Sequence, residues 1–502
     1  MSAGAPLPRV EGLERLGDEI GAELRERFAA AGYDAALIGE AESVAPQQFD
    51  AVRLPLVHAW LERRGGPGAL CAGLFSYEHP ARREDAEEAL GATLVDALLD
   101  AGVLRDRGDR SVEAAYRLVP FMGLHLISDP LDARADAVMG PSPTTLVLAR
   151  LVPERPGRVV DLGCGAGSLA LLAAARGARE AVGVDRNARA IAISRCNARL
   201  NGLRAEFLAG DRLEPVRGRR FDRVISQPPY VPRPEGVGVA TWLHGGSRGD
   251  ELPLAFAAAA AEALSESGQA WLLFDAPPSR EPVHARLRAA LDAAAVDLVA
   301  LVSPGPSLDL QAAAYASLED VRLGPGYREA VHRYRAHLEA LGGGAFSRVL
   351  ALLRSCRMPG GDLTAQIPAA SLARFDAVAL DALWRGLALA SSGEAELLDA
   401  RLRLARGAIL GEERSAGALA ADPARTLRFA PDALPVGHEI SEGGAILLAA
   451  LDGSVNVAAA VARFAEACGE PPEAVRRKVL DFVREGLGRA WLAPVDSPGG
   501  GS

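Results

Sequence analysis

The spacing of apolar positions changes twice along the chain, which divides it into three parts. In the first part the apolar residues recur every three or four positions, as they do on one face of a helix. We expect helices over 13–31, 49–63 and 83–101, and short strand pieces over 103–104, 114–118 and 124–126. Residues 1–136 are therefore predicted to form a mainly helical N-terminal domain with a small β wing.

The second part alternates short apolar strands with helices. The strands are expected over 159–160, 181–184, 205–208, 221–225, 269–274, 296–302 and 347–353. Continuous apolar strands separated by helices are typical of a parallel sheet covered by helices on both faces. Residues 137–357 are therefore predicted to be an α/β domain with a Rossmann-like, seven-stranded sheet that carries one hairpin edge.

The third part, residues 358–502, changes to helices joined by loops. It ends with three helical segments, 442–451, 457–467 and 473–485, and a short β piece within 486–493. Three helices followed by a β piece resemble a winged-helix module. We expect this region to be helical and winged-helix-like, with a disordered tail over 497–502.

The charge balance bears on partners. The net charge of −10 disfavours a protein that coats nucleic acid, because phosphate contacts need clustered basic residues. Residues 151–260 carry 16 arginines against 11 acidic residues, a local excess that we interpret as a solvated mixed surface. A peptide, protein or small molecule is the expected partner, and nucleic acid is disfavoured.

Five scattered cysteines without a CxxC pair fit reduced thiols, hence a cytoplasmic protein without a zinc site. Residues 1–12 lack a signal pattern, and no run of about 18 apolar residues occurs, so neither secretion nor a membrane span is expected. Lys478 is the only lysine, which makes lysine-based catalysis improbable.

A glycine turn follows the first strand of the α/β part, and its glycines are Gly163, Gly165 and Gly167. Glycines let the backbone approach a ligand closely. The dinucleotide pattern GxGxxG would need glycine where Ser168 stands, so the GxGxG turn favours S-adenosylmethionine over NAD. Asp185 ends the next strand about twenty positions on, where a carboxylate accepts both ribose hydroxyls of an adenosine.

Three further residues are predicted to bind this cofactor. Asp161, just before the turn, is placed to hold the cationic amino group, although it could instead cap the approach to the helix. Asp211 follows the third strand, where an acid can contact the adenine amino group, or be a plain turn aspartate. Arg186, beside Asp185, joins this set.

A second turn, here called the QPPY turn, follows the fourth strand and has the sequence Gln227-Pro228-Pro229-Tyr230. The prolines fix the backbone and leave carbonyls free to accept hydrogen bonds from a planar NH2 group. The amide oxygen of Gln227 can accept one N–H, and Tyr230 can stack on the planar face of the acceptor. These four residues are predicted to be catalytic, and positioning is expected to supply most of the rate.

The two turns together resemble a class I S-adenosylmethionine-dependent methyltransferase. The turn after the fourth strand is similar to that of one branch of this class, in which Asn, Asp or Ser is followed by Pro-Pro and then Tyr or Phe. That branch holds enzymes that methylate release-factor glutamine, DNA adenine and ribosomal RNA guanine. More loosely, residues 10–355 resemble a group of bacterial proteins that have a helical domain ahead of this catalytic domain.

Gln227 departs from the pattern of that branch. Its side chain is one methylene longer than Asn, about 1.5 Å, which would displace the acceptor. Either the substrate lies deeper, or an oxygen or carbon atom is methylated; alternatively, the turn is kept for structure alone. His244, in the following glycine-rich loop, is predicted to act as a base for an acidic acceptor, with a surface role as the alternative.

Three functions remain open on these grounds. The first is N-methylation of a planar amide or amine in a peptide, protein or nucleobase. The second is a natural-product methyltransferase with a small oxygen or nitrogen acceptor. The third is a binding scaffold without catalysis. Tyr315, Tyr327, Tyr334 and His332 can line a substrate cleft, but helical packing explains them equally well.

Overall fold

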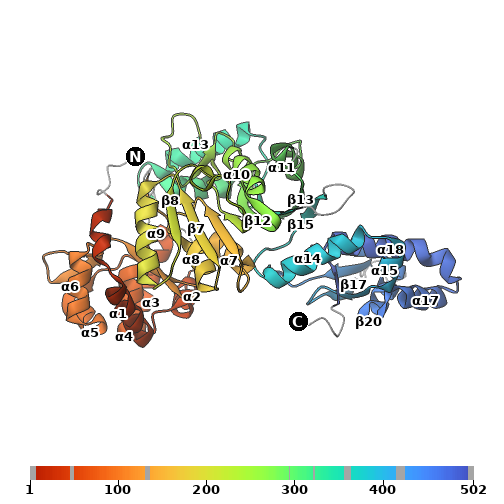
Figure 1. Ribbon diagram of the computed structural model, residues 1–502, viewed down its shortest axis with the longest axis horizontal. Helices are drawn as coiled ribbons and strands as arrows, with labels where there is room; N and C mark the ends of the chain where they lie inside the picture. The colour runs from red at the N-terminus through yellow and green to blue at the C-terminus, as the bar shows by residue number, and fades with distance from the viewer. Residues whose placement is uncertain are drawn as a thin grey trace. The chain divides into compact units, whose positions relative to one another are not determined.

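A computed structural model describes residues 7–45, 50–130, 136–292, 294–319, 323–355, 363–413 and 424–495. It separates the chain into two compact units (Figure 1). Unit 1 comprises Met1–Ala300 and Gly305–Ala365, and unit 2 comprises Leu301–Pro304 and Gln366–Ser502. The predicted boundary between residues 136 and 137 lies within unit 1 and stays a prediction, and the one between 357 and 358 falls outside the described residues.

The N-terminal part of unit 1 is mainly helical, as the apolar spacing predicts. Its helices are η1 (Val10–Arg15), α1 (Asp18–Ala31), α2 (Ala35–Ser43), α3 (Asp50–Arg64), α4 (Gly66–Cys71), η2 (Ala72–Ser76), α5 (Arg83–Leu90) and α6 (Ala92–Asp100). The expected helix over 83–101 is two helices, because the chain breaks at Gly91, whose φ is 91°. The helix expected over 13–31 is likewise split, between η1 and α1.

The β wing of this part is larger than expected. It consists of β1 (Ala81–Arg82), β2 (Leu104–Asp106), β3 (Ser111–Ala114), β4 (Arg117–Phe121) and β5 (Leu124–Ser128). The first three form a sheet in the order β1-β3-β2, and β4 and β5 form a hairpin. A core that includes Phe28, Tyr33 and Phe75 joins these strands to the helices.

The large sheet has eight strands in the order β15-β13-β14-β12-β9-β6-β7-β8. Its strands are β6 (Arg158–Leu162), β7 (Glu180–Asp185), β8 (Glu206–Ala209), β9 (Phe221–Ser226), β12 (Leu264–Ala276), β13 (Val296–Pro304), β14 (Ser347–Ser355) and β15 (Thr364–Pro368). The pairs from β8 to β12 are parallel, and β14, which lies between β13 and β12, runs antiparallel to β12. Seven strands match the prediction, and β15 is an eighth at the edge.

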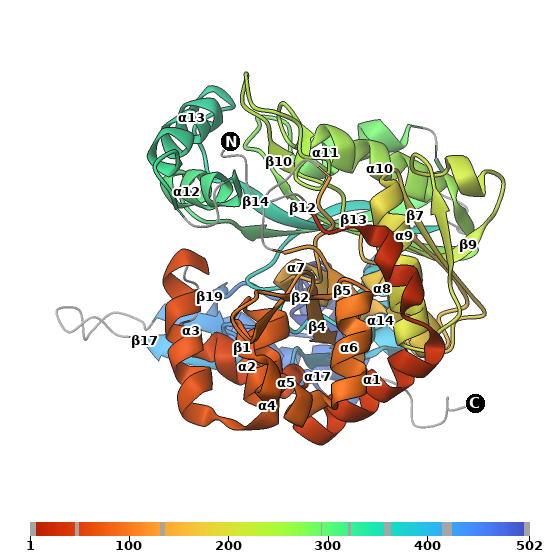
Figure 2. The same cartoon turned by 90° about the vertical axis from the view of Figure 1, so that its left-hand side faces the viewer.

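Helices cover both faces of this sheet, as expected for parallel strands. Figure 2 shows α10 and α11 above the sheet and α7 and α8 below it. The bounds of the helices are α7 (Pro143–Leu151), α8 (Ser168–Ala175), α9 (Ala188–Leu200), η3 (Glu214–Val216), α10 (Glu251–Glu262) and α11 (Val283–Leu291). A capping box starts α7, in which the Ser142 hydroxyl accepts from the Thr145 amide and Thr145 Oγ1 accepts from the Ser142 amide.

A helical hairpin is inserted between β13 and β14. Its helices, α12 (Leu308–Glu319) and α13 (Tyr327–Ala340), lie side by side in Figure 2. They enclose an apolar cluster with the loop that follows the QPPY turn, where β10 (Val231–Pro232) pairs with β11 (His244–Gly246). The insert therefore forms a wall beside the QPPY turn.

Helix α9 ties the N-terminal part to the sheet. Asn197 and Asn201, one helical turn apart, each accept from an amide of β5 and donate to the carbonyl of the same β5 residue, Ile127 and His125 respectively, over 2.7–3.0 Å. Asn197 is fully buried and also donates to the carbonyl of Ala166, in the glycine turn. Their side chains thus join two parts of the chain that lie far apart in the sequence.

Unit 2 differs from the helical region expected there. Its helices are α14 (Ala377–Ala390), α15 (Glu394–Asp399), α16 (Glu442–Ala450), α17 (Val457–Cys468) and α18 (Pro472–Gly488). Its strands are β16 (Arg401–Leu404), β17 (Ile409–Glu413), β18 (Ala424–Arg428), β19 (His438–Ile440), β20 (Asp452–Asn456) and β21 (Leu492–Pro494). They form two three-stranded sheets, β20-β16-β21 and β17-β18-β19.

The last three helices and β21 lie where the sequence places them, but the five preceding strands were missed. The winged-helix likeness stays a prediction, and the tail expected over 497–502 lies outside the described residues. Within the described ranges, no helix has the length and apolar run that crossing a membrane requires.

Candidate active site

The carboxyl ends of β6, β7, β8 and β9 meet at one edge of the sheet, where the strand order reverses. Such a point is where open α/β sheets bind ligands. A cavity of about 670 Å³ lies here. It is lined by ten of the twelve predicted site residues: Asp161, Gly163, Gly165, Asp185, Arg186, Asp211, Gln227, Pro228, Pro229 and Tyr230. Gly167 and His244 are not among its lining residues.

The glycine turn follows β6 and has positive φ at all three glycines. Gly167, with φ of 81°, leads into α8, and a Cβ there would stand 2.9 Å from Ser194 Cβ and 3.0 Å from the Phe207 ring. Gly167 therefore allows α8 to pack closely on its neighbours, and Gly163 and Gly165 face the cavity.

Asp185 links the turn to the end of β7. One carboxylate oxygen accepts from the Gly165 amide and the other from the Asn187 amide, both over 2.9 Å. Burial raises the pKa of Asp185, and the two amides counteract that rise. Each carboxylate oxygen keeps a lone pair beyond these bonds, which leaves acceptors for a ligand diol.

Asp161 is 3% exposed and lines the cavity where α8 begins. Its pKa is raised to about 7, chiefly by burial and also by the charge of Asp185, while the amides of Ala170 and Leu169 counteract this rise. Those amides belong to the first turn of α8, so Asp161 has the geometry of a helix cap as well as a place in the cavity. The two interpretations of this residue are thus compatible.

Asp211 and Arg186 lie at the exposed rim of the cavity. The Asp211 carboxylate accepts from Arg212 Nε at 3.0 Å and from a second Arg212 nitrogen at 2.7 Å. A ligand amino group would share this carboxylate with Arg212. The assignment of Asp211 to the adenine remains a prediction.

Gln227 is held at both ends of its side-chain amide by helix α7. Its Oε1 accepts from the Thr145 hydroxyl at 2.9 Å, and its Nε2 donates to Thr144 Oγ1 at 2.7 Å. Nothing in the sequence pattern connects these two threonines with the QPPY turn. The one methylene that Gln227 has beyond Asn lets its side-chain amide reach α7.

Tyr230, at the end of the turn, is half-buried in the cavity wall. Its pKa is raised to about 12, chiefly by burial and also by the charge of Asp275, while Arg348 and the Thr144 hydroxyl counteract this rise. The phenol is therefore protonated at neutral pH. Its ring is available to contact a planar acceptor in the cavity.

The structure does not bring His244 to the cavity. The pairing of β10 with β11 turns its side chain inward, where it is 6% exposed. Its Nδ1 accepts from the Ala240 amide at 3.1 Å, and its Nε2 lies 3.3 Å from the Tyr334 hydroxyl. Burial lowers its pKa to about 4. A packing role for His244 fits this geometry, and its role as a base has no support from it.

Of the four residues of the inserted helices that the sequence offers as cleft residues, Tyr315 lines the cavity. Tyr334 belongs to the apolar cluster of the insert, and the Tyr327 hydroxyl donates to the carbonyl of Ala313. Sequence reasoning missed Asp275 and Arg348, which also line the cavity and pair across β12 and β14 at 2.8 and 3.1 Å. An acidic and a basic residue directly opposite each other on paired strands would indicate such an ion pair. The sequence does not show which strands pair, so this pair could not be predicted from it.

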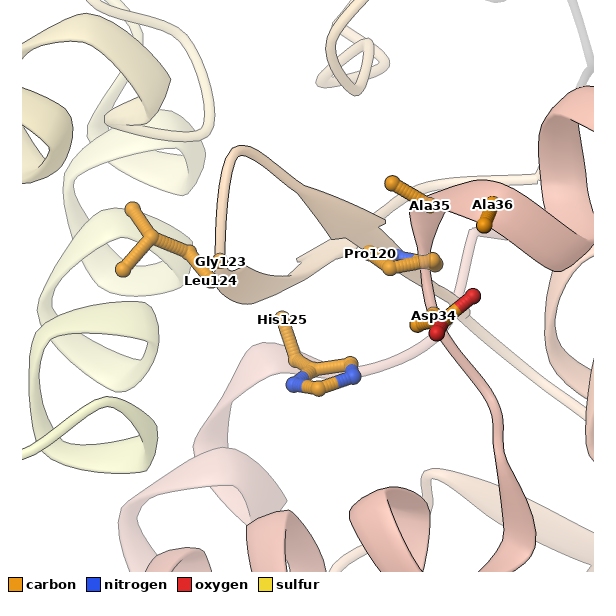
Figure 3. A pocket seen from close by; sticks show the side chains of 7 residues that line it. All are labelled: Asp34, Ala35, Ala36, Pro120, Gly123, Leu124 and His125. Carbon is orange, nitrogen blue, oxygen red and sulfur yellow. The ribbon is translucent and has the colours of Figure 1, made fainter.

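A second pocket, of about 250 Å³, lies in the N-terminal part (Figure 3). Its polar side chains are used within the fold. Asp34 accepts from the Leu37 amide and caps α2, and His125 Nε2 lies 3.3 Å from the Tyr33 carbonyl. This pocket offers no group for chemistry comparable to the main cavity. Within the described residues, no three His, Cys, Asp or Glu side chains gather as a metal site.

The chain is similar to curated methyltransferases. It is 38% identical over 79 residues to ribosomal RNA small subunit methyltransferase C of Alcanivorax borkumensis, covering 16% of this chain and 24% of that protein. It is 32% identical over 127 residues to the release factor glutamine methyltransferase of Geobacter sulfurreducens (23% and 44%), and 33% over 138 residues to that of Escherichia coli (26% and 48%). The chain thus spans less than half the length of these relatives.

Solved structures give weaker matches. Trm5b from Pyrococcus abyssi has a TM-score of 0.31 and 14% identity, over 52% of this chain and 68% of that one. A geranyl diphosphate methyltransferase in complex with SAM has a TM-score of 0.29 and 17% identity, over 42% and 84%. The family comparison is the more specific finding: residues 141–296, which contain both the glycine turn and the QPPY turn, match the methyltransferase small domain.

Proposed function

We propose that the protein is an S-adenosylmethionine-dependent methyltransferase that methylates the nitrogen of a planar amide or amine. The observation that carries this proposal is the convergence of the glycine turn, Asp185 and the QPPY turn on one cavity. The likeness of residues 141–296 to methyltransferases supports it. By their names, these relatives methylate a release-factor glutamine or a ribosomal RNA. The acceptor of this chain is inferred instead from the residues of its own site.

The residues at the strand ends fit the cofactor. The positive φ values of the turn bring its backbone to the cavity without side chains, and Asp185 presents carboxylate oxygens beside it. Asp161, in the same wall, would hold the cationic amino group of the cofactor through its ionised carboxylate. When bound, S-adenosylmethionine supplies an electrophilic methyl group on a sulfonium.

The QPPY turn orients the acceptor. The two prolines hold its backbone, and Tyr230 offers an aromatic face to a planar group. Thr144 and Thr145 fix the Gln227 amide, whose Oε1 keeps one lone pair for an acceptor N–H after the bond from Thr145. This arrangement favours a nitrogen acceptor among the alternatives left open by Gln227, because it directs a hydrogen-bond acceptor at an N–H donor.

The first experiment measures S-adenosylhomocysteine binding by calorimetry for the native protein and for Asp185→Ala. Binding that the substitution weakens at least tenfold supports the cofactor site. No binding to the native protein refutes the methyltransferase assignment and favours a scaffold.

The second experiment follows radiolabelled methyl from S-adenosylmethionine into the peptide, RNA and small-molecule fractions of a cell extract. Label on nitrogen that Gln227→Ala reduces supports the proposal. Label confined to oxygen or carbon atoms refutes N-methylation, and label only in the small-molecule fraction favours the natural-product alternative.

A further inference from the structure

An ion pair in the cavity wall lies across the QPPY turn from the predicted cofactor residues. In the strand order β14-β12-β9-β6-β7-β8, the QPPY turn follows β9, and Asp161 and Asp185 belong to β6 and β7. Asp275 and Arg348 belong to β12 and β14, on the other side of β9. The part of the cavity beside β12 and β14 is therefore the place for the methyl acceptor, because the QPPY turn separates it from the cofactor residues.

The strand register sets this ion pair level with the turn. The last pair between β12 and β9 joins Leu272 to Ser226, at the end of β9. Strand β12 continues beyond this pair, while the chain leaves β9 and forms the QPPY turn. Asp275 thus runs alongside the turn, and Arg348 is its partner in register on β14. Both residues line the cavity together with Tyr230.

Asp275 fixes the guanidinium of Arg348 and leaves one of its nitrogens open. Nε donates to one carboxylate oxygen at 2.8 Å, and Nη2 donates to the other at 3.1 Å. The Asp275 side chain is 7% exposed, whereas the Arg348 side chain is 38% exposed. Within the part of the chain that the structure describes, Nη1 makes no hydrogen bond. A ligand in the cavity therefore meets a donor whose position is already set.

The charge around Arg348 favours a neutral oxygen over an anion. The other charged residues that line the cavity lie at the ends of β6, β7 and β8, and the remaining lining residues are uncharged. The Asp275 carboxylate already balances the charge of Arg348. A carboxylate from the acceptor would lose its hydration here without an unpaired cation to compensate. A carbonyl oxygen can accept a hydrogen bond from Nη1 without that cost.

We propose that Arg348 is a specificity-determining residue, whose Nη1 donates a hydrogen bond to a neutral carbonyl oxygen of the methyl acceptor. This inference rests on the proposed function and narrows the acceptor. An amide carries such an oxygen beside its nitrogen, whereas adenine and simple amines do not. The QPPY turn then takes the N–H of the acceptor and Arg348 takes its oxygen, so that two contacts from different strands fix the orientation of the planar group.

The test compares benzamide, a neutral planar amide, with benzoate, an anion of the same shape. Each is titrated into the full-length protein saturated with S-adenosylhomocysteine, and binding is followed by saturation-transfer NMR. We expect benzamide to bind more tightly than benzoate. The double substitution Asp275→Asn/Arg348→Met removes the Nη1 donor and keeps the pair neutral, and it should weaken benzamide binding at least tenfold, which corresponds to about 1.4 kcal/mol.

The chain offers a matched control at the other end of β14. Arg354 donates from Nε and Nη2 to Asp297 at 2.9 and 2.7 Å, and the Asp297 side chain is also 7% exposed. Neither residue is among those that line the cavity. Asp297→Asn/Arg354→Met should therefore bind benzamide as the native protein does, which separates loss of the donor from loss of a buried ion pair.

A single substitution covers the case in which the Asp275→Asn/Arg348→Met protein does not fold. Arg348→Lys keeps the charge opposite Asp275 but has only one nitrogen, which that carboxylate engages. We expect it to weaken benzamide binding in the same direction.

Four results would overturn the assignment of Arg348. They are a benzamide affinity that neither Arg348 variant changes, an equal loss of affinity in the control, an absence of benzamide binding to the native protein, and benzoate binding that is tighter than benzamide binding and depends on Arg348. S-adenosylhomocysteine binding by calorimetry reports separately on the proposed function. If that binding fails, the same benzamide titration of the protein alone still decides the role of Arg348.

Discussion

The buried carboxyl of Asp161 predicts a pH-dependent affinity for the cofactor. Its pKa of about 7 in the free protein means that about 3% of it is ionised at pH 5.5 and about half at pH 7. The amino group of the ligand is a cation throughout this range and binds the ionised form. S-adenosylhomocysteine should therefore bind up to about fifteenfold more tightly at pH 7 than at pH 5.5.

Calorimetry at intermediate pH values measures this slope directly. In buffers of different ionisation enthalpy it also counts the protons released, which should approach one per ligand at pH 5.5. Asp161→Asn keeps the shape of the side chain and removes the titration, so its affinity should be lower at pH 7 and nearly independent of pH. A native affinity that is flat over this range, or an unchanged slope in Asp161→Asn, would show that Asp161 does not face the ligand cation.

The same raised pKa has a consequence for the stability of the protein without ligand. The folded chain binds this proton more tightly than the unfolded chain, in which an aspartate titrates near pH 4. The contribution of Asp161 to the free energy of unfolding therefore falls as the pH rises from about 4 to about 7. Urea unfolding of the native protein and of Asp161→Asn should diverge across this interval, with the substituted protein the less sensitive to pH.

Three further predictions concern the turns and helix α9. Asn197→Leu should lower the free energy of unfolding by about 3–5 kcal/mol, because it leaves three backbone groups buried without partners; a loss below about 1 kcal/mol in urea unfolding would contradict this. Gly167→Ala should cost about 1–3 kcal/mol, whereas Gly218→Ala, also at positive φ but in open space, should cost about 1 kcal/mol; equal losses would contradict the packing role of Gly167. Thr145→Val should lower kcat/KM for methyl transfer about tenfold, because Gln227 loses its hydroxyl contact, while S-adenosylhomocysteine affinity stays unchanged; a parallel loss of that affinity would indicate general damage.

The glycine turn and the alternation of strands with helices were predictable because their signals are local. Gly163 and Asp185 lie about twenty positions apart, and a βαβ unit converts that spacing into neighbouring strand ends. The QPPY turn follows a strand for the same reason. Local spacing therefore accounts for the cofactor half of the candidate site.

The acceptor half depends on contacts between distant segments, which spacing does not encode. His244 looks like a loop histidine in the sequence, but Tyr334, 90 positions later, covers it. Asp275 and Arg348 meet only because β12 and β14 pair across a hairpin insert. In unit 2 the strands are three to five residues long, too short for their alternation to stand out from the surrounding helical pattern.

The contact of Asn197 and Asn201 with β5 also bears on self-association. Within the β4–β5 hairpin, the outward-facing amides and carbonyls of His125 and Ile127 form an edge that another strand could pair with. Two side-chain amides from a helix occupy those groups instead. Helix α9 thereby covers the edge of the β4–β5 hairpin. Loss of these side-chain contacts would expose an edge strand that can pair with another chain and lead to aggregation.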